Sequence, residues 1–114
     1  MKKEEKIINQ TEFECLVVII NSGYSDVVMD AARKEGAKGG TILHARGTAT
    51  KELTSKFNIT LSPDKELILI LVHNSIRDKV LLSINTAAGL GTDCQGIAFS
   101  LPVSDVCGIK RDSD

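Results

Sequence analysis

The chain has 114 residues and a formal net charge of −1, with 42% hydrophobic, 25% charged and 4% aromatic residues. This length suits one domain with a single core. The near-neutral charge argues against binding to a nucleic-acid backbone, and the scarcity of aromatic rings argues against a surface on which bases stack.

The three cysteines, Cys15, Cys94 and Cys107, form no CxxC pair. An odd cysteine count, together with a first segment too charged for a signal peptide, predicts reduced thiols and a cytoplasmic protein. No apolar run approaches the roughly 18 residues needed to span a bilayer, so we expect no direct membrane insertion.

The chain divides into three parts by composition. Residues 1–13 are charged and polar and form an N-terminal extension, in which Ile7-Ile8 is a candidate short pairing segment. Residues 14–110 form the folded domain, and residues 111–114 form a loose tail.

The first predicted elements are a strand and a helix. Residues 15–20, CLVVII, are continuously apolar and β-branched, which is typical of a strand buried on both faces. Ser22 or Ser25 would cap the following helix, and Gly36 would end it in a left-handed cap. The side chains predicted on its apolar face are Val27, Val28, Ala31 and Ala32.

A second strand follows within residues 39–47, GGTILHARG. Alternation places Leu43 and Ala45 on one face and Ile42, His44 and Arg46 on the other. The connection over residues 47–65 is rich in Thr, Ser and Lys and ends in a predicted type I turn, SPDK. Long connections in compact domains are often functional.

The second half repeats this plan. Residues 66–72, ELILILV, predict a strand, and Ser75 and Asp78 would cap a helix that Gly89 ends. Its apolar positions are Ile76, Val80, Ile84 and Ala88. A glycine-bearing loop, residues 89–96, precedes a strand in which Ile97, Phe99, Leu101 and Val103 would point inward. Pro102 places that strand, or its end, at a sheet edge, and residues 106–110 would add a short last strand.

This order predicts an α+β fold, a ferredoxin-like βαββαβ sandwich with two helices on one face of an antiparallel sheet. The other face would need cover. We expect Ile42, His44 and Arg46 on that face, and oligomerisation as the way in which so small a domain covers it.

The segments DVVMDAARKEGAKGGTILHARGT and ELILILVHNSIRDKVLLSINTAAGLGTDCQGIAFSLPV resemble the PII family of nitrogen-regulatory signal proteins. The resemblance spans roughly residues 15–110. It implies a ferredoxin-like protomer, a homotrimer and adenine nucleotides bound in the clefts between subunits. It further implies that residues 47–65 correspond to the T-loop, through which these proteins engage a regulated transporter or enzyme.

The resemblance also implies a ligand site. Gly39, Gly40 and Thr41 match the segment that approaches the nucleotide from one subunit, and Arg46 and Gly47 match the base of the T-loop. Gly91 and Gly96 match the glycine loop of the neighbouring subunit, and Lys110 matches a phosphate-binding arginine. His44 is a further candidate, as a ligand contact, an interface residue or a solvated side chain. Glycines admit phosphate oxygens to backbone N–H groups, and an arginine offers a bidentate fork.

Some positions depart from the family pattern. Ile97 stands where the family has a phosphate-contacting lysine, Cys94 where it has a glycine, and Gly108 where it has an arginine. The 47–65 connection contains no tyrosine, which argues against regulation by tyrosine uridylylation.

The leading hypothesis is therefore a regulatory protein without enzymatic activity or a metal site. It would bind ATP, ADP, AMP or another small anion and control a partner through residues 47–65, in nitrogen metabolism. The alternative is a trimeric divalent-metal binder like the CutA proteins, and a metal set of His44, His73 and Cys94 would lack paired ligand spacing. A hydrolase with Cys94 as nucleophile is a third hypothesis.

Overall fold

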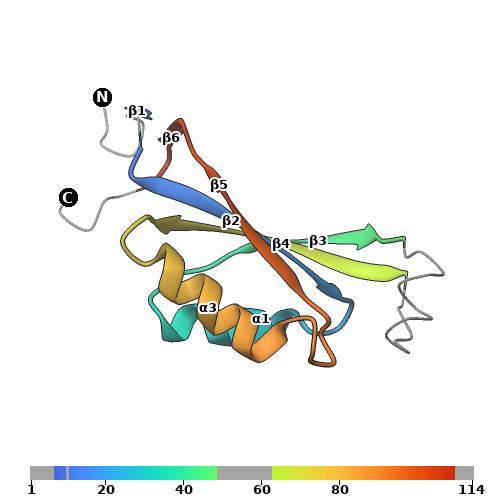
Figure 1. Ribbon diagram of the computed structural model, residues 1–114. Coiled ribbons are helices and arrows are strands. Elements are labelled where there is room, and N and C mark those ends of the chain that lie inside the picture. Colours follow the sequence, from blue (N-terminus) through green and yellow to red (C-terminus); the bar gives the residue numbers. More distant parts are fainter. Residues whose placement is uncertain (1–6, 10, 49–62, 110–114) are drawn as a thin grey trace.

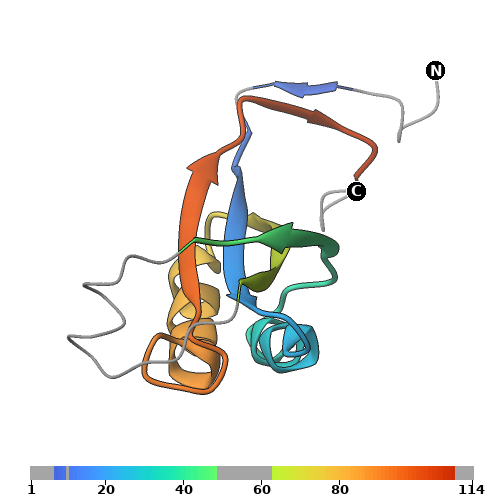
Figure 2. The ribbon, with the colours of Figure 1, turned by 90° about the vertical axis from the view of Figure 1, so that its right-hand side faces the viewer.

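The computed structural model describes residues 7–9, 11–48 and 63–109. Two helices, α1 (Ser25–Lys34) and α3 (Arg77–Ala88), lie together on one side of a four-stranded sheet (Figure 1). The strands of this sheet are β2 (Phe13–Asn21), β3 (Thr41–Arg46), β4 (Asp64–His73) and β5 (Ile97–Pro102). Two short strands, β1 (Ile7–Asn9) and β6 (Asp105–Cys107), form a separate ribbon (Figure 2).

The main sheet is antiparallel, with the strand order β3-β4-β2-β5. The two longest apolar runs of the sequence therefore occupy the two central strands. Register pairs Leu16 with Ile70 and Val18 with Ile68. The predicted ferredoxin-like fold is confirmed, and β5 lies at a sheet edge as the proline near its end predicted.

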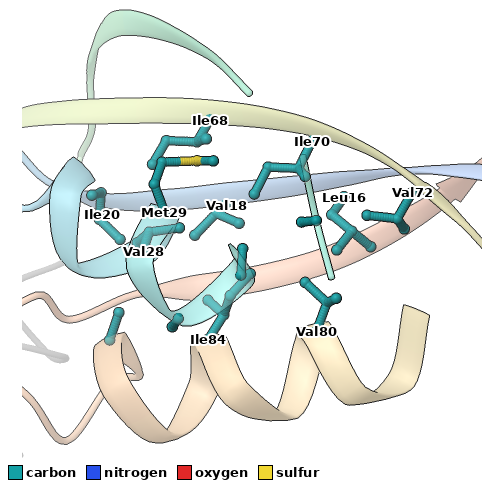
Figure 3. Packing of buried hydrophobic residues seen from close by; sticks show 14 of the residues in the cluster. Leu16, Val18, Ile20, Val28, Met29, Ile68, Ile70, Val72, Val80 and Ile84 are labelled. Atoms are coloured by element: carbon teal, nitrogen blue, oxygen red, sulfur yellow. The ribbon is translucent and has the colours of Figure 1, made fainter. Parts of the chain in front are cut away.

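The core lies between the helices and the facing side of β2 and β4 (Figure 3). Every second residue of β4 from Glu66 to Val72 is buried, as period-two alternation requires. The largest fully buried side chains are Leu16, Val18, Ile20, Val28, Ile68, Ile70, Val80 and Ile84. One charged group lies among them: the Glu66 side chain accepts a hydrogen bond from the Gly23 backbone N–H at 2.8 Å, which offsets part of the cost of its burial.

Helix α1 buries Val28, Ala31 and Ala32 as predicted, and Met29 in addition, whereas Val27 is 37% exposed. Gly36 follows the helix with φ +106°, so the predicted left-handed residue is confirmed. The Gly36 N–H donates to Arg33 O at 3.0 Å and the Ala37 N–H to Ala32 O at 3.1 Å. This pair of bonds is the Schellman motif, which satisfies carbonyls at the helix end.

The predicted serine caps are wrong. Neither helix has a side-chain cap hydrogen bond, and the N-cap residues are Tyr24 and Ile76. Ser25 is already the first residue of α1, so its hydroxyl lies past the capping position. The Ser75 hydroxyl instead hydrogen bonds to His73 Nδ1 at 2.8 Å, while the Asp78 carboxylate accepts from Arg77.

The sheet side opposite the helices, called the open face here, is apolar and uncovered in the protomer. The side chains that register and alternation assign to it include Cys15, Val17, Ile19, Leu43, Leu67, Leu69, Leu71, Ile97, Phe99 and Leu101. Ile97, Phe99, Leu101 and Leu43 are between 42% and 57% exposed. The prediction that residues of β5 point inward is thus wrong for the protomer, because Ala98 faces the helices instead.

The predicted orientation of β3 is also wrong. Ile42, His44 and Arg46 stand opposite Ile68, Glu66 and Asp64, which belong to the helix side of β4. Leu43 therefore faces the open side. All six residues of β3 are exposed, including Ile42 at 44%, which shows that the helices do not cover this strand.

The β1–β6 ribbon projects beyond the main sheet (Figures 1 and 2). Ile7 pairs with Cys107, and Asn9 with Asp105. The Thr11 N–H donates to Ser104 O at 3.2 Å, and the Thr11 hydroxyl donates to Val103 O. The predicted pairing segment in the N-terminal extension is thus a strand, and its partner is the predicted short last strand.

Candidate functional site

The first candidate segment leads into β3, and its glycines have different surroundings. A Cβ on Gly40 would lie 3.0 Å from Leu69 O and 3.1 Å from Met29 Sδ, so Gly40 is needed for close packing. A Cβ on Gly39 would meet nothing within 4 Å. Gly39 and Thr41 are exposed, and their backbone is accessible to a ligand or to another chain.

His44 and Arg46 lie further along the same exposed edge strand. Gly47 follows, and its N–H donates to Pro63 O at 2.8 Å, which brings the two described ends of the 47–65 connection together. The side chain of Lys65 passes over Gly47, because a Cβ there would be 3.1 Å from both Lys65 Cγ and Cε. The middle of this connection, residues 49–62, lies outside the described residues.

The predicted glycine loop joins α3 to β5. A Cβ on Gly96 would lie 2.2 Å from Ala88 O, and the Gly96 N–H donates to that oxygen at 2.7 Å. Gly96 thus allows the loop to close against the helix end. Gly91 is exposed and a Cβ there would meet nothing within 4 Å, so its backbone is open to a ligand. Cys94 is buried at 3% exposure, which leaves its thiol unsuited to act as a surface nucleophile.

Sequence reasoning missed Asn21, the last residue of β2. Its Nδ2 donates to Asp93 O at 3.0 Å and to Gln95 Oε1 at 3.3 Å, both in the glycine loop. Its Oδ1 accepts from Lys65 Nζ at 2.6 Å. A polar residue directly after the apolar run CLVVII was the available signal, but its partners depend on the register of β2 with β4.

The structure separates the predicted site residues into two groups. β3 carries Thr41, His44 and Arg46 at one sheet edge, and the glycine loop leads into β5 at the other edge. Three strand spacings separate these edges, roughly 14 Å. Within one protomer the β3 segment and the glycine loop therefore do not form one cleft, and Lys110 lies outside the described residues.

A second polar cluster occupies the opposite end of β4. His73 Nε2 lies 2.8 Å from Glu12 Oε2, and His73 Nδ1 accepts from the Ser75 N–H at 3.1 Å. The bond to Ser75 closes the turn between β4 and α3, and the contact with Glu12 connects this turn to the segment before β2. Next to them, Arg77 binds Glu14 at 2.7 Å and Asp78 at 3.0 Å, and the hydrogen bond to Asp78 and the charge of Glu14 raise the Arg77 pKa.

The described residues contain no group of three or more His, Cys, Asp or Glu that could hold a metal ion. His44 and His73 stand at opposite ends of the sheet, and Cys94 lies in the glycine loop, so these three do not assemble in the protomer. Among the residues that the structure describes, neither helix is long and apolar enough to cross a membrane.

The outer surface of the two helices carries a shallow groove of about 850 Å³. Val27, Ala31, Leu82 and Ala87 line its apolar part, and Lys34 and Lys79 contribute charge. The groove lies on the face away from the sheet and includes none of the predicted ligand residues.

The topology and the glycine-bearing segments define a class: an α+β protein with a ferredoxin-like protomer and an uncovered apolar sheet face. Residues 13–113 match the model of the family described as Nitrogen regulatory protein P-II. The chain therefore belongs to the P-II family, as the resemblance predicted.

Solved structures agree on the fold. Arabidopsis thaliana PII, solved with citrate, is 24% identical with a TM-score of 0.66, and the match covers 90% of this chain and 89% of that one. A Bacillus subtilis GlnK–ATP complex is 16% identical with a TM-score of 0.63, covering 82% and 84%. CPII from Thiomonas intermedia K12, bound to ADP, AMP and acetate, is 15% identical with a TM-score of 0.61, covering 93% of each chain. A search of curated sequences finds no match.

Proposed function

We propose that the chain is a PII-like signal-transduction protein that binds a small anion, with ATP, ADP and AMP as the first candidates, between copies of itself. The observation that carries this proposal is the family match over residues 13–113, which includes both β3 and the glycine loop. Related folds solved with ATP, with ADP, AMP and acetate, and with citrate support an anionic ligand. The protein acts by binding and not by catalysis.

The separation of the two predicted groups supports a site between subunits. One copy contributes Gly39, Thr41, His44 and Arg46 from its edge strand, and another contributes Gly91 with its loop. The open face supports the assembly, because a monomer rarely exposes so continuous an apolar surface. A homotrimer that buries this face would bring edge strands and loops of different copies together.

Each proposed contact has a physical role. The Arg46 guanidinium is a bidentate partner for phosphate or carboxylate oxygens, and the exposed backbone at Gly39 and Gly91 lets N–H groups approach them. Gly40 and Gly96 shape the site through packing. Gly47 and Lys110 stay proposals from the resemblance. By the same resemblance, residues 47–65 would engage a regulated transporter or enzyme in nitrogen metabolism. The Gly47–Pro63 bond holds the base of this connection on the edge where Arg46 lies.

Calorimetry with ATP, ADP and AMP tests the ligand. We expect binding of at least one nucleotide, and at a hundredfold excess over Kd we expect stabilisation of about 2.7 kcal/mol. Arg46→Ala should weaken binding, whereas Arg33→Ala, an exposed arginine at the end of α1, should not. Absence of binding by all three nucleotides at millimolar concentration would refute the nucleotide assignment.

Sedimentation of the full chain tests the assembly separately. We expect a trimer at micromolar concentration. A lone protomer under those conditions would contradict the site between subunits, because its two groups would never meet.

A further inference from the structure

Asn21 lies where three segments of the chain converge. It ends β2, its side chain reaches the glycine loop through Asp93 O and Gln95 Oε1, and it holds Lys65 at the start of β4. Its backbone N–H also donates to Cys94 O at 2.9 Å. In Figure 1 the end of β2 lies beside the loop that joins α3 to β5, in agreement with these bonds.

The chemistry of these contacts requires a carboxamide. The Lys65 ammonium has only donors and needs an acceptor, whereas Asp93 O and Gln95 Oε1 need donors. Asn21 supplies both through Oδ1 and Nδ2. An aspartate would keep the acceptor for Lys65 and place a carboxylate oxygen, which cannot donate, against the backbone oxygen of Asp93.

The glycine loop is strained at its contact with Asn21. Gln95 has φ +48°, the one positive φ of a non-glycine residue in the described part of the chain. Left-handed backbone is costly for a residue with a Cβ. The Gln95 N–H bond to Thr92 O at 3.0 Å and the bond from Asn21 Nδ2 hold this conformation. A strained residue held by its neighbours can change conformation when those contacts change.

Lys65 contacts both Asn21 and Gly47. Its aliphatic stem passes over Gly47, where any larger residue would meet Lys65 carbons at 3.1 Å. The Ser22 N–H donates to Asp64 O at 3.0 Å and fixes the same strand end. The contacts are therefore continuous from Gln95 through Asn21 and Lys65 to Gly47.

We propose that Asn21 is a positioning residue that couples the glycine loop to Lys65 and Gly47, the described base of the 47–65 connection. An anion that rearranges the glycine loop then changes the stability of the Gly47–Pro63 contact. By thermodynamic reciprocity, a partner that fixes this base changes the affinity for the anion. The link exists whether or not the protein has the proposed function, but the response of the link to a ligand rests on the proposed function.

The link is tested first without ligand, by NMR amide exchange on the full chain. Lys65→Met keeps the stem over Gly47 and removes the ammonium that binds Asn21. We expect it to speed exchange of the Gln95 amide about fivefold, the effect of one hydrogen bond. In an Asn21→Ala background the same change should have no effect on Gln95. The Val18 amide, in the central strand, reports global unfolding and serves as the internal reference.

The ligand experiment uses ADP and ATP at saturation. In the unmodified chain we expect nucleotide to change exchange of the Gly47 amide. In Asn21→Asp, which removes the Nδ2 donor to the glycine loop, this response should be smaller, because the part transmitted through Asn21 is lost and only a direct contact of Arg46 with the anion remains. Asn74→Asp, at the opposite end of β4, makes the same chemical change as a control and should retain it.

The outcomes are distinguishable. Unchanged Gln95 exchange in Lys65→Met, relative to Val18, overturns the link even if nucleotides bind. A Gly47 response of unchanged size in Asn21→Asp overturns the coupling. If neither nucleotide binds, the ligand assignment fails, and the ligand-free experiment still decides whether Asn21 joins the two segments.

Discussion

Replacing Gly96 with alanine should destabilise the protein strongly, although the substitution adds one methyl group. The new Cβ would lie 2.2 Å from Ala88 O and 3.1 Å from Ile20 Cγ2. Since Ala88 O is a backbone atom at the end of α3, it cannot move aside as a flexible side chain would. The loop must retreat, and the 2.7 Å bond from the Gly96 N–H to the same oxygen is lost.

The magnitude follows from two contributions. Loss of the hydrogen bond costs about 1 kcal/mol, and the displaced backbone and core contact add about 1–3 kcal/mol. We therefore expect Gly96→Ala to lower the free energy of unfolding by about 2–4 kcal/mol. For a domain of this size that corresponds to a decrease in Tm of roughly 10 °C.

Urea denaturation at fixed protein concentration measures this change, with Gly91→Ala as the matched control from the same loop. A Cβ at Gly91 meets nothing within 4 Å, so its stability should change by no more than about 0.5 kcal/mol. If Gly91 faces the ligand, its variant should lose nucleotide affinity while it keeps its stability. Equal stability of both variants and the parent chain would refute the close approach of the loop to α3.

Three further predictions concern the helix cap, the core and the open face. Gly36→Ala should cost about 1–2 kcal/mol in urea denaturation, because φ +106° is unfavourable for a residue with a Cβ; no loss would contradict the left-handed cap. Ile84→Ala should cost about 2–5 kcal/mol, since Ile84 is only 2% exposed, and the exposed Leu82→Ala should cost far less. Phe99→Glu should reduce the trimer in sedimentation, whereas Leu82→Glu on the helix surface should not; retained assembly in Phe99→Glu would exclude the open face as the interface.

The order of elements could be predicted from the sequence because each element has its own local pattern. Val80, Ile84 and Ala88 recur with helical spacing and are buried, and Gly36 adopts the conformation that its position after a helix predicts. The orientation of β3 could not be predicted in this way. Leu67–Leu71 is apolar on both faces, so the sequence of β4 does not show which face Ile42 or Leu43 joins. The register of Leu43 with Leu67 decides it.

The candidate site was predictable only where the required residue type is distinctive. Glycines stood out, yet their surroundings differ: Gly40 and Gly96 are needed for packing, and Gly39 and Gly91 leave open backbone. Asn21 was missed because a lone asparagine after a strand usually marks a turn. Its contacts with Asp93 and Lys65 join residues 72 and 44 positions away, which no local pattern can show.

The pairing of Ile7 with Cys107 places the first and last described strands side by side. A circularly permuted chain, with a short peptide joining these two residues and new ends opened at the exposed Asn74–Ser75 turn, would keep every strand pair of both sheets. Conversely, a protease cut or an insertion within residues 7–9 would disturb β6, because β6 would lose the strand it pairs with.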